Sequence, residues 1–155
     1  MTMKKLWFNI LFKCGVIDRI TWLRSRGMTI GEHCAILNDV YIDPGAEGQI
    51  SIGDQVTLAP FVMLIAHDAS TKRPLGYTRF RPIVIEDNSF IGAGTLILPG
   101  VRIGHDTIIG AGSVVTHDIP ANSVAFGNPA EVHTDMPSFL HRRSQIDLAG
   151  LGGTR

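Results

Sequence analysis

Aliphatic residues recur at every sixth position along most of this chain. The longest run occupies six consecutive repeat positions, namely Ile85, Ile91, Ile97, Ile103, Ile109 and Val115. Two shorter runs have the same spacing and consist of Ile30, Ile36 and Ile42, and of Ile52, Leu58 and Leu64. A helix repeats every ~3.6 residues and a strand every ~2, so neither element alone produces this pattern. The period of six therefore restricts the fold more than any other feature of the sequence.

A period of six suits a chain in which each unit forms one short strand and one tight turn. Three units then close a triangular coil of about 18 residues, and stacked coils form a parallel β-helix. The aliphatic residues would point inward, so we expect Ile85 to stack on Ile103 and Ile91 on Ile109. Glycine often follows the aliphatic residue, as at Gly92, where it would tolerate an unusual backbone and crowding at the coil corner. The repeat positions together predict about four coils.

The repeats predict one β-helix domain over residues 27–134. Between Leu64 and Ile85 the chain contains fifteen residues beyond one repeat, which predicts an extruded loop over residues 67–82. Such a loop on a rigid scaffold is a common place for binding groups. The loop is therefore the first place to look for chemistry.

Both flanks of the repeat region have their own patterns. Residues 1–26 carry apolar side chains at steps of three and four, which predicts an amphipathic helical segment. This segment would cover an end of the core or pack on a partner, and an interfacial membrane helix is the alternative. Pro120 and Pro129 suggest that the chain leaves the strand ladder there. Residues 135–155 are expected to form a C-terminal tail, which we expect to be mobile from His141 onward.

The composition excludes several classes of partner. The 14 basic and 14 acidic residues balance to a formal charge of zero, so no cationic footprint for nucleic acid is present. No apolar run reaches the ~20 residues that a membrane span needs. Cys14 and Cys34 are too sparse for a disulfide scaffold, and we expect both to be reduced and buried. A cytoplasmic location is expected.

The repeats, a "HD" pair at 67–68, the stretch "IGAGSVVTHDIP" and the later "GNPA" resemble the hexapeptide-repeat O-acetyltransferases. The sugar and polysaccharide acetyltransferases, such as galactoside and maltose acetyltransferases, are the most similar group. The resemblance covers about residues 28–134 and implies an all-β fold, a left-handed parallel β-helix. It further implies transfer of an acetyl group from acetyl-CoA to a sugar hydroxyl, and a homotrimer with each active site between two prisms.

The resemblance assigns the catalytic base to His67, the histidine that opens the extruded loop. A neutral imidazole suits removal of a hydroxyl proton near neutral pH. A carboxylate should hold its other nitrogen. Asp68 is adjacent but should point elsewhere, so Asp43 and Glu86 are the candidates from other coils. Because no G-x-S-x-G or paired Cys and His accompanies His67, direct transfer is favoured over an acyl-enzyme.

The resemblance also implies positions for the two substrates. Acetyl-CoA would lie in the groove between prisms, along Phe90, Gly92, Ala93, Ala111, Gly112, Thr116 and His117. Small residues there would let the extended arm of the cofactor approach the backbone, although coil corners demand small residues for their own reasons. His117 and Glu131 stand where the family often has Lys and Arg for the phosphates. Candidate acceptor contacts are Asn38, Asp39, Tyr77, Arg79 and Arg81.

Two alternatives remain open at this point. A γ-class carbonic anhydrase shares the fold and binds zinc through three histidines. His67 and His105 are 38 residues apart, near two coils, but the close second pair of histidines is missing, so no metal is expected. A non-enzymatic β-helix that serves as a scaffold is the other alternative.

Overall fold

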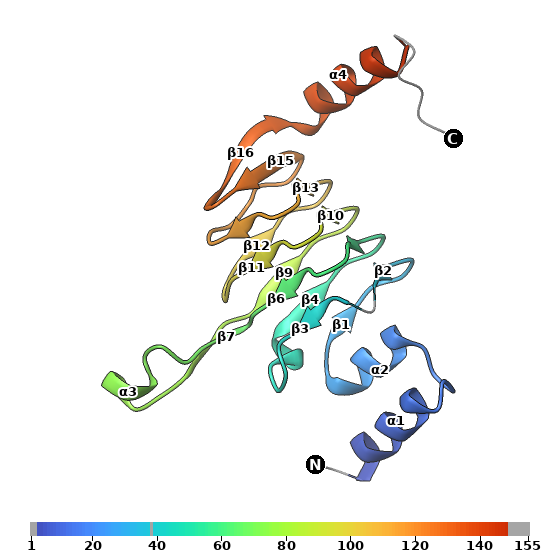
Figure 1. The fold of residues 1–155 in the computed structure, drawn as a ribbon, viewed down its shortest axis with the longest axis vertical. Coiled ribbons are helices and arrows are strands. Elements are labelled where there is room, and N and C mark those ends of the chain that lie inside the picture. Colours follow the sequence, from blue (N-terminus) through green and yellow to red (C-terminus); the bar gives the residue numbers. More distant parts are fainter. Residues whose placement is uncertain (1–2, 38, 149–155) are drawn as a thin grey trace.

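The structure, a computed structural model, describes residues 3–37 and 39–148 and shows short strands wound into a three-faced prism (Figure 1). Face A consists of β1 (Thr29–Ile30), β4 (Ile50–Ile52), β9 (Ile83–Ile85) and β12 (Arg102–Ile103). Face B consists of β2 (Ala35–Ile36), β5 (Thr57–Leu58), β10 (Phe90–Ile91), β13 (Ile108–Ile109) and β15 (Ser123–Gly127). Face C consists of β3 (Tyr41–Ile42), β6 (Met63–Leu64), β11 (Leu96–Ile97) and β14 (Val114–Val115). All neighbours within these faces are parallel, which confirms the predicted parallel β-helix.

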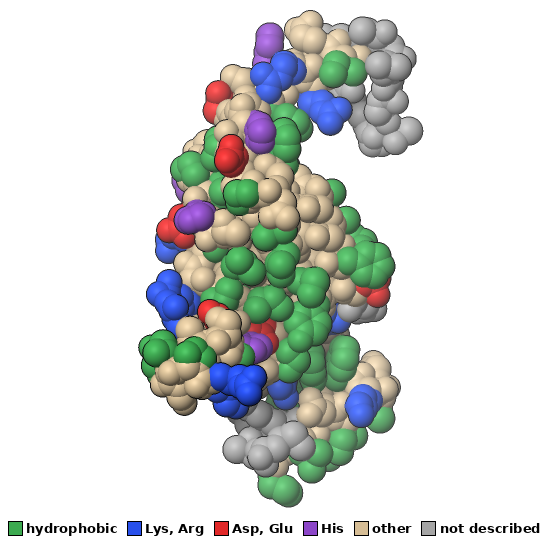
Figure 2. Space-filling model, turned by 60° about the vertical axis from the view of Figure 1, so that its left-hand side comes forward, with side chains coloured by type: hydrophobic (Ala, Val, Ile, Leu, Met, Phe, Trp, Pro, Cys, Tyr) green, Lys and Arg blue, Asp and Glu red, His purple; other side chains and the backbone are tan. Residues whose placement is uncertain are grey.

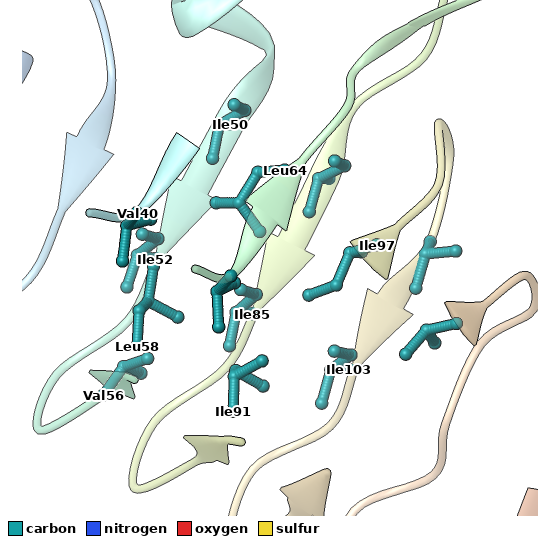
Figure 3. Close-up of a cluster of buried hydrophobic side chains, with 14 of the residues drawn as sticks. Val40, Ile50, Ile52, Val56, Leu58, Leu64, Ile85, Ile91, Ile97 and Ile103 are labelled. Carbon is teal, nitrogen blue, oxygen red and sulfur yellow. The ribbon is translucent and has the colours of Figure 1, made fainter. Parts of the chain in front are cut away.

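The register of the strands confirms the predicted stacking of the repeat positions. Ile85 lies opposite Ile103 on face A, and Ile91 lies opposite Ile109 on face B. The side chains of Ile85, Ile91 and Ile103 point into the prism (Figure 3), and Ile109 belongs to the same buried cluster. All four are at most 1% exposed, and burial of such a side chain is worth about 1.5–3 kcal/mol. The core is thus a column of aliphatic side chains shared by successive coils.

The chain turns at three edges, which we name by the faces that they join. The A–B edge contains residues 31–34, 53–56, 86–89 and 104–107, and the B–C edge contains residues 59–62, 92–95 and 110–113. The C–A edge contains residues 43–49, 65–82, 98–101 and 116–118. At these turns the backbone repeatedly adopts a positive φ, for example 56° at Asn88 and 53° at Asp106.

Of the two reasons expected for the glycines that follow the aliphatic positions, the structure shows the crowding but not the unusual backbone. The positive φ falls two residues later, as at Gly94, with a φ of 70°. At Gly92 itself an added Cβ would lie 2.5 Å from the Ala111 nitrogen and 2.7 Å from the Ile109 oxygen. Gly92 is therefore required because the next coil approaches too closely for a side chain.

We expect Gly92→Ala to lower the free energy of unfolding by ~1–3 kcal/mol, because the contacts beside it are backbone atoms that cannot move aside. Gly48→Ala is the matched control, since its Cβ would have only one neighbour, at 3.9 Å, and should change stability by less than ~0.5 kcal/mol. Urea unfolding of both variants measures the difference. Equal stability of the two variants would contradict the crowding argument.

The N-terminal segment contains two helices, α1 (Met3–Lys13) and α2 (Arg19–Arg26), and α2 is the one that covers the first coil. Asp18 caps α2 by accepting a hydrogen bond from the Thr21 N–H at 3.0 Å. Leu23 of α2 is fully buried in the core. The Arg24 guanidinium donates to the Ile30 carbonyl of β1 at 2.8 Å, and the short helix η1 (Glu47–Gln49) adjoins α2. Helix α2 thus lies against the first coil, and α1 packs on α2.

At the other end, the chain stays in the ladder after Pro120, contrary to our expectation. Strand β15 continues face B beside β13, and β16 (Ala130–Asp135) then folds back antiparallel on β15. The tail is also more ordered than predicted, because α4 (Met136–Leu148) follows β16 and projects from the prism (Figure 1). Asp135 caps α4 by accepting from the Ser138 N–H at 2.8 Å, a local signal that the weak periodicity of the tail obscured.

Two smaller expectations concern the cysteines and membrane spans. Both cysteines are free, but Cys14 is exposed and Cys34 is half-buried, so the expected burial was wrong. The Cys34 thiol lies 3.0 Å from the Gly53 carbonyl oxygen, which accepts its weak hydrogen bond. Within residues 3–37 and 39–148 no helix combines the length and apolar character needed to cross a bilayer.

Candidate active site

His67 stands where the extruded loop leaves the prism. Its strand β7 (His67–Asp68) pairs antiparallel with β8 (Arg79–Phe80), and α3 (Lys72–Leu75) lies between them. The Arg81 N–H donates to the Ala66 carbonyl at 3.0 Å and closes the base of the hairpin. We call residues 67–82 the arm, and it projects from the C–A edge (Figure 1). The predicted extruded loop is thus an ordered hairpin.

The carboxylate of Asp43 holds His67 from the coil below. Asp43 follows β3 at the same edge and is fully buried. Its Oδ2 lies 2.6 Å from the His67 Nδ1 and accepts hydrogen bonds from the backbone N–H groups of Ala66 at 2.9 Å and His67 at 3.0 Å. One oxygen therefore orients the ring and anchors the backbone on which the ring stands.

This contact defines the tautomer of His67. An ionised carboxylate only accepts hydrogen bonds, so the Nδ1 of a neutral imidazole must carry the proton that Asp43 accepts. The lone pair then resides on Nε2, which is left to accept a proton from a ligand. The side chain of His67 is 38% exposed, so the ring combines a buried anchor with solvent access.

Two open pockets adjoin the ring on different sides of the arm. The first pocket, of about 530 Å³, is lined by Ile65, His67, Asp68, Arg79, Arg81, Leu98, Pro99 and Thr116. The second pocket, of about 310 Å³, is lined by Pro44, Gly45, His67, Ala69, Lys72, Thr78 and Phe80. Among the described residues, His67 alone belongs to both linings. The imidazole can therefore meet one ligand from the later coils and another from the first coil.

Comparison with known proteins places this chain in a family. Residues 82–117 match the family described as bacterial transferase hexapeptide (six repeats). The chain is 37% identical to the galactoside O-acetyltransferase of Lactococcus lactis, in a match covering 81% of this chain and 73% of that enzyme. The chain belongs to the hexapeptide-repeat acetyltransferases. The fold of this acetyltransferase is accordingly the left-handed parallel β-helix.

Solved structures support the same assignment. A maltose O-acetyltransferase from Clostridium difficile superposes with a TM-score of 0.65 at 29% identity and 86% coverage of both chains. A galactoside acetyltransferase in complex with coenzyme A superposes with a TM-score of 0.62 at 29% identity, covering 86% of this chain and 80% of that one. The resemblance stated from the repeats and motifs is therefore confirmed.

The other carboxylates near the acetyltransferase site have different partners. Hydrogen bonds from the side chain and backbone N–H of Ser70 hold the pKa of Asp68 below its ordinary value, with a smaller contribution from Arg79. Glu86 lies at the A–B edge, where it accepts from the His105 N–H at 3.0 Å and pairs with Arg102. Those two contacts, the first being the larger, lower the pKa of Glu86. Of the candidate carboxylates, only Asp43 contacts the ring of His67 among the described residues.

The predicted cofactor residues of the acetyltransferase divide between two edges. Thr116 lines the first pocket with His67, and its hydroxyl lies 2.7 Å from the Nδ1 of the exposed His117. The others lie on face B or at the B–C edge, away from His67 within one chain, and comprise Phe90, Gly92, Ala93, Ala111 and Gly112. The structure therefore brings together only part of the predicted set.

The predicted acceptor contacts are also dispersed. Arg79 lines the first pocket, whereas Tyr77 lies on the arm outside both linings, with 55% of its surface exposed. Asp39 is exposed near Arg19, where its charge opposes the lowering of the Arg19 pKa by burial. Asn38 lies outside the described residues. Of the described candidates, Arg79 and Arg81 thus accompany His67 in the first pocket, whereas Tyr77 and Asp39 do not.

Several residues at the site of the acetyltransferase were missed from sequence. Leu98 and Pro99 line the first pocket, while Pro44 and Gly45 line the second. For Leu98 the sequence did contain a usable signal. The register that stacks Leu64, Ile97 and Val115 also aligns the residues that follow them, and one of those is Leu98.

His67 and His105, the two histidines considered as zinc ligands in the sequence analysis, can now be located in the structure. His67 follows face C and His105 follows face A, so the two histidines stand at different edges of the prism. Within the described ranges, no three His, Cys, Asp or Glu side chains converge as metal ligands would. A zinc centre needs three or four such groups around one point.

Proposed function

We propose that this acetyltransferase moves the acetyl group of acetyl-CoA to a hydroxyl of a sugar or polysaccharide precursor, with His67 as the general base. The observation that carries the proposal is the contact of Asp43 with the Nδ1 of His67, a residue that lines two pockets, since this contact leaves Nε2 free to accept a proton. The comparison proteins support the choice of substrates, since they act on galactosides or maltose and one was solved with coenzyme A.

In the proposed step the acceptor oxygen attacks the thioester carbonyl carbon while its proton passes to Nε2 of His67. The carbonyl oxygen becomes the oxyanion of a tetrahedral intermediate. Collapse of that intermediate breaks the carbon–sulfur bond, and the imidazolium returns the proton to the departing thiolate. Buried Asp43 stabilises the imidazolium while it exists. Alignment of the two substrates in one complex contributes up to ~7–11 kcal/mol to lowering the barrier.

The two pockets suggest separate positions for donor and acceptor. The first pocket is the larger, faces the later coils and contains Arg79 and Arg81, which suit the anionic coenzyme. The second pocket lies beside the first coil and contains the single cation Lys72 among its described lining residues. We therefore assign acetyl-CoA to the first pocket and the acceptor hydroxyl to the second.

A screen of free and nucleotide-linked sugars tests the proposed activity. Purified protein is mixed with acetyl-CoA and each sugar in turn, and release of the CoA thiol is followed. We expect acceptor-dependent release with at least one sugar, and transfer of the acetyl group to that sugar by mass spectrometry. Thiol release that no sugar accelerates would contradict the assignment of the acceptor class.

A homotrimer is part of the proposal because a single chain places only some of the predicted cofactor residues beside its own His67. Hydrophobic side chains gather over the prism beside the arm (Figure 2). Tyr41 and Met63 are neighbours in face C, and Phe61 adjoins them at the B–C edge with 64% of its surface exposed. Burying such a patch against a second copy would bring the B–C edge of one prism to the arm of another.

Light scattering tests this arrangement. We expect a mass of three times the 16.9 kDa chain, and we expect Phe61→Asp to dissociate the trimer, because it places a charge in the apolar contact. Asp tolerates the φ of 62° at this position. Val16→Asp, at an equally exposed apolar residue between α1 and α2, is the matched control and should leave the mass unchanged. A monomeric wild-type protein would overturn the shared site.

A further inference from the structure

Helix α1 presents an uncovered apolar face. Met3, Leu6, Trp7 and Ile10 recur at steps of three and four and are 85%, 43%, 61% and 47% exposed. These four residues are called the α1 face below. The side of α1 that carries Phe12 packs instead on α2, where its ring stacks on Trp22 at 4.9 Å. The helix is therefore held on one side, while large apolar side chains on the other meet solvent.

A groove extends this apolar surface toward the prism. The groove has a volume of about 680 Å³ and lies between α1, α2 and the first coil. Leu6 and Ile10 belong both to its lining and to the α1 face, so the two surfaces are continuous. Pro44 lines this groove as well as the second pocket beside His67. The groove thus adjoins the second pocket beside His67.

The charge of the chain is strongly divided between this segment and the rest. Residues 1–26 contain six Lys or Arg residues and one Asp, a net charge of +5, so the remaining residues carry −5 because the whole chain is neutral. Arg24 and Arg26 pair with Glu32 and Glu47 of the first coil. Lys13 at the end of α1 is exposed, and Lys4 and Lys5 belong to the same helix in sequence. Hydrophobic and basic side chains also meet at the lower end of Figure 2.

We propose that α1 binds the surface of a membrane containing anionic phospholipids. An amphipathic helix with a tryptophan on its apolar face and the exposed Lys13 at its end suits the boundary between headgroups and acyl chains. At 11 residues α1 is too short to span the bilayer, which takes ~20, so it lies in the plane of the membrane. The excess positive charge selects anionic lipids, and the α1 face and its groove provide the apolar contact. The proposal is independent of the acetyl transfer.

Vesicle co-sedimentation of the full chain tests the proposal. One set of vesicles is pure phosphatidylcholine, and the other mixes phosphatidylcholine with phosphatidylglycerol at a ratio of about 2:1. We expect binding to the mixed vesicles to be at least ~10 times tighter than to the neutral ones and to weaken as salt is raised. Failure of the wild-type protein to bind the mixed vesicles would overturn the proposal.

Variants separate the contribution of the apolar α1 face to vesicle binding from the contribution of the positive charge. The double variant Trp7→Glu, Ile10→Glu should abolish binding, and Lys13→Glu, which leaves the α1 face intact, should weaken binding to the mixed vesicles alone. Leu140→Glu is the matched control, because Leu140 is an apolar residue of α4 that is 57% exposed, and it should bind as the wild type does. Circular dichroism checks that each variant keeps its fold.

The main competing occupant of the α1 face is a second copy of this chain. In that case the double variant would lower the mass measured by light scattering, and the wild-type protein would not bind the mixed vesicles. Binding that survives the double variant would likewise contradict the proposal, because the α1 face would then not be the contact.

Discussion

His67→Ala is expected to lower kcat by ~10²–10⁴, because in the proposed mechanism Nε2 takes the proton from the attacking hydroxyl. Affinity for CoA should change little, since His67 is one of several residues that line the first pocket. Steady-state kinetics with the best acceptor from the screen measure kcat, and calorimetry measures CoA binding. A loss of kcat with retained CoA binding is the signature expected of a group that acts on the reacting atoms.

His105→Ala is the matched control for this variant. His105 also has a carboxylate partner, Asp106, at 2.7 Å from its Nδ1, but it stands at the A–B edge and lines neither pocket beside the arm. Its replacement should leave kcat within a factor of ~2. Normal turnover by the His67 variant would remove His67 from the mechanism, whatever the control shows.

Asp43→Asn is expected to lower kcat by ~10–10³ and to leave CoA binding unchanged. The amide oxygen can still accept from the backbone N–H groups of Ala66 and His67, so the arm should keep its place. The negative charge that would stabilise the imidazolium in the proposed mechanism is lost, however. The Oδ1 of Asp43 is buried and accepts no hydrogen bond from the described residues, so an amide NH₂ placed there would lack an acceptor. This adds a stability loss of ~1–3 kcal/mol.

Denaturant unfolding and steady-state kinetics together test the role of Asp43 as a positioning residue. Asp106→Asn is the control, because it makes the same substitution in an exposed His–Asp pair at a φ of 53° that asparagine accepts. It should affect neither stability nor kcat appreciably. If Asp43→Asn lost stability but turned over at the normal rate, the contact with His67 would serve the fold alone.

Much of the fold could be predicted from the sequence because the signal was repeated. Each inward position, such as Ile91, indicates a buried aliphatic side chain in the same way as the other repeat positions. Misreading one repeat therefore does not change the predicted architecture. The ends of the prism lack this redundancy. Helix α4 depends on one cap, Asp135, and β15 continues a face past Pro120 without a repeat glycine to mark it. A single local signal of this kind is weak evidence for a helix or strand where the surrounding segment has no clear hydrophobic periodicity.

The site could be predicted only in part for a related reason. The break in the regular pattern drew attention to His67, and the family resemblance then assigned it the role of catalytic base. Its partner Asp43 is 24 residues earlier in the sequence, too far for a local motif to connect the two. From sequence Asp43 was one of two candidates, and only the stacking of the coils in the structure distinguished it from Glu86. The cofactor residues were assigned by resemblance as one set, yet they lie at two edges of the prism. Spacing alone does not tell which edge a small residue occupies.

The sequence by itself determined the scaffold and the position of its interruption. A period of six leaves the chain one way to bury its aliphatic residues, and the fifteen extra residues must then leave the prism. Only the tertiary structure decided which carboxylate meets His67, that His67 lines two pockets, and that the face of α1 is left uncovered. These outcomes depend on contacts between coils and between helices, and such contacts exist only once the chain has folded on itself.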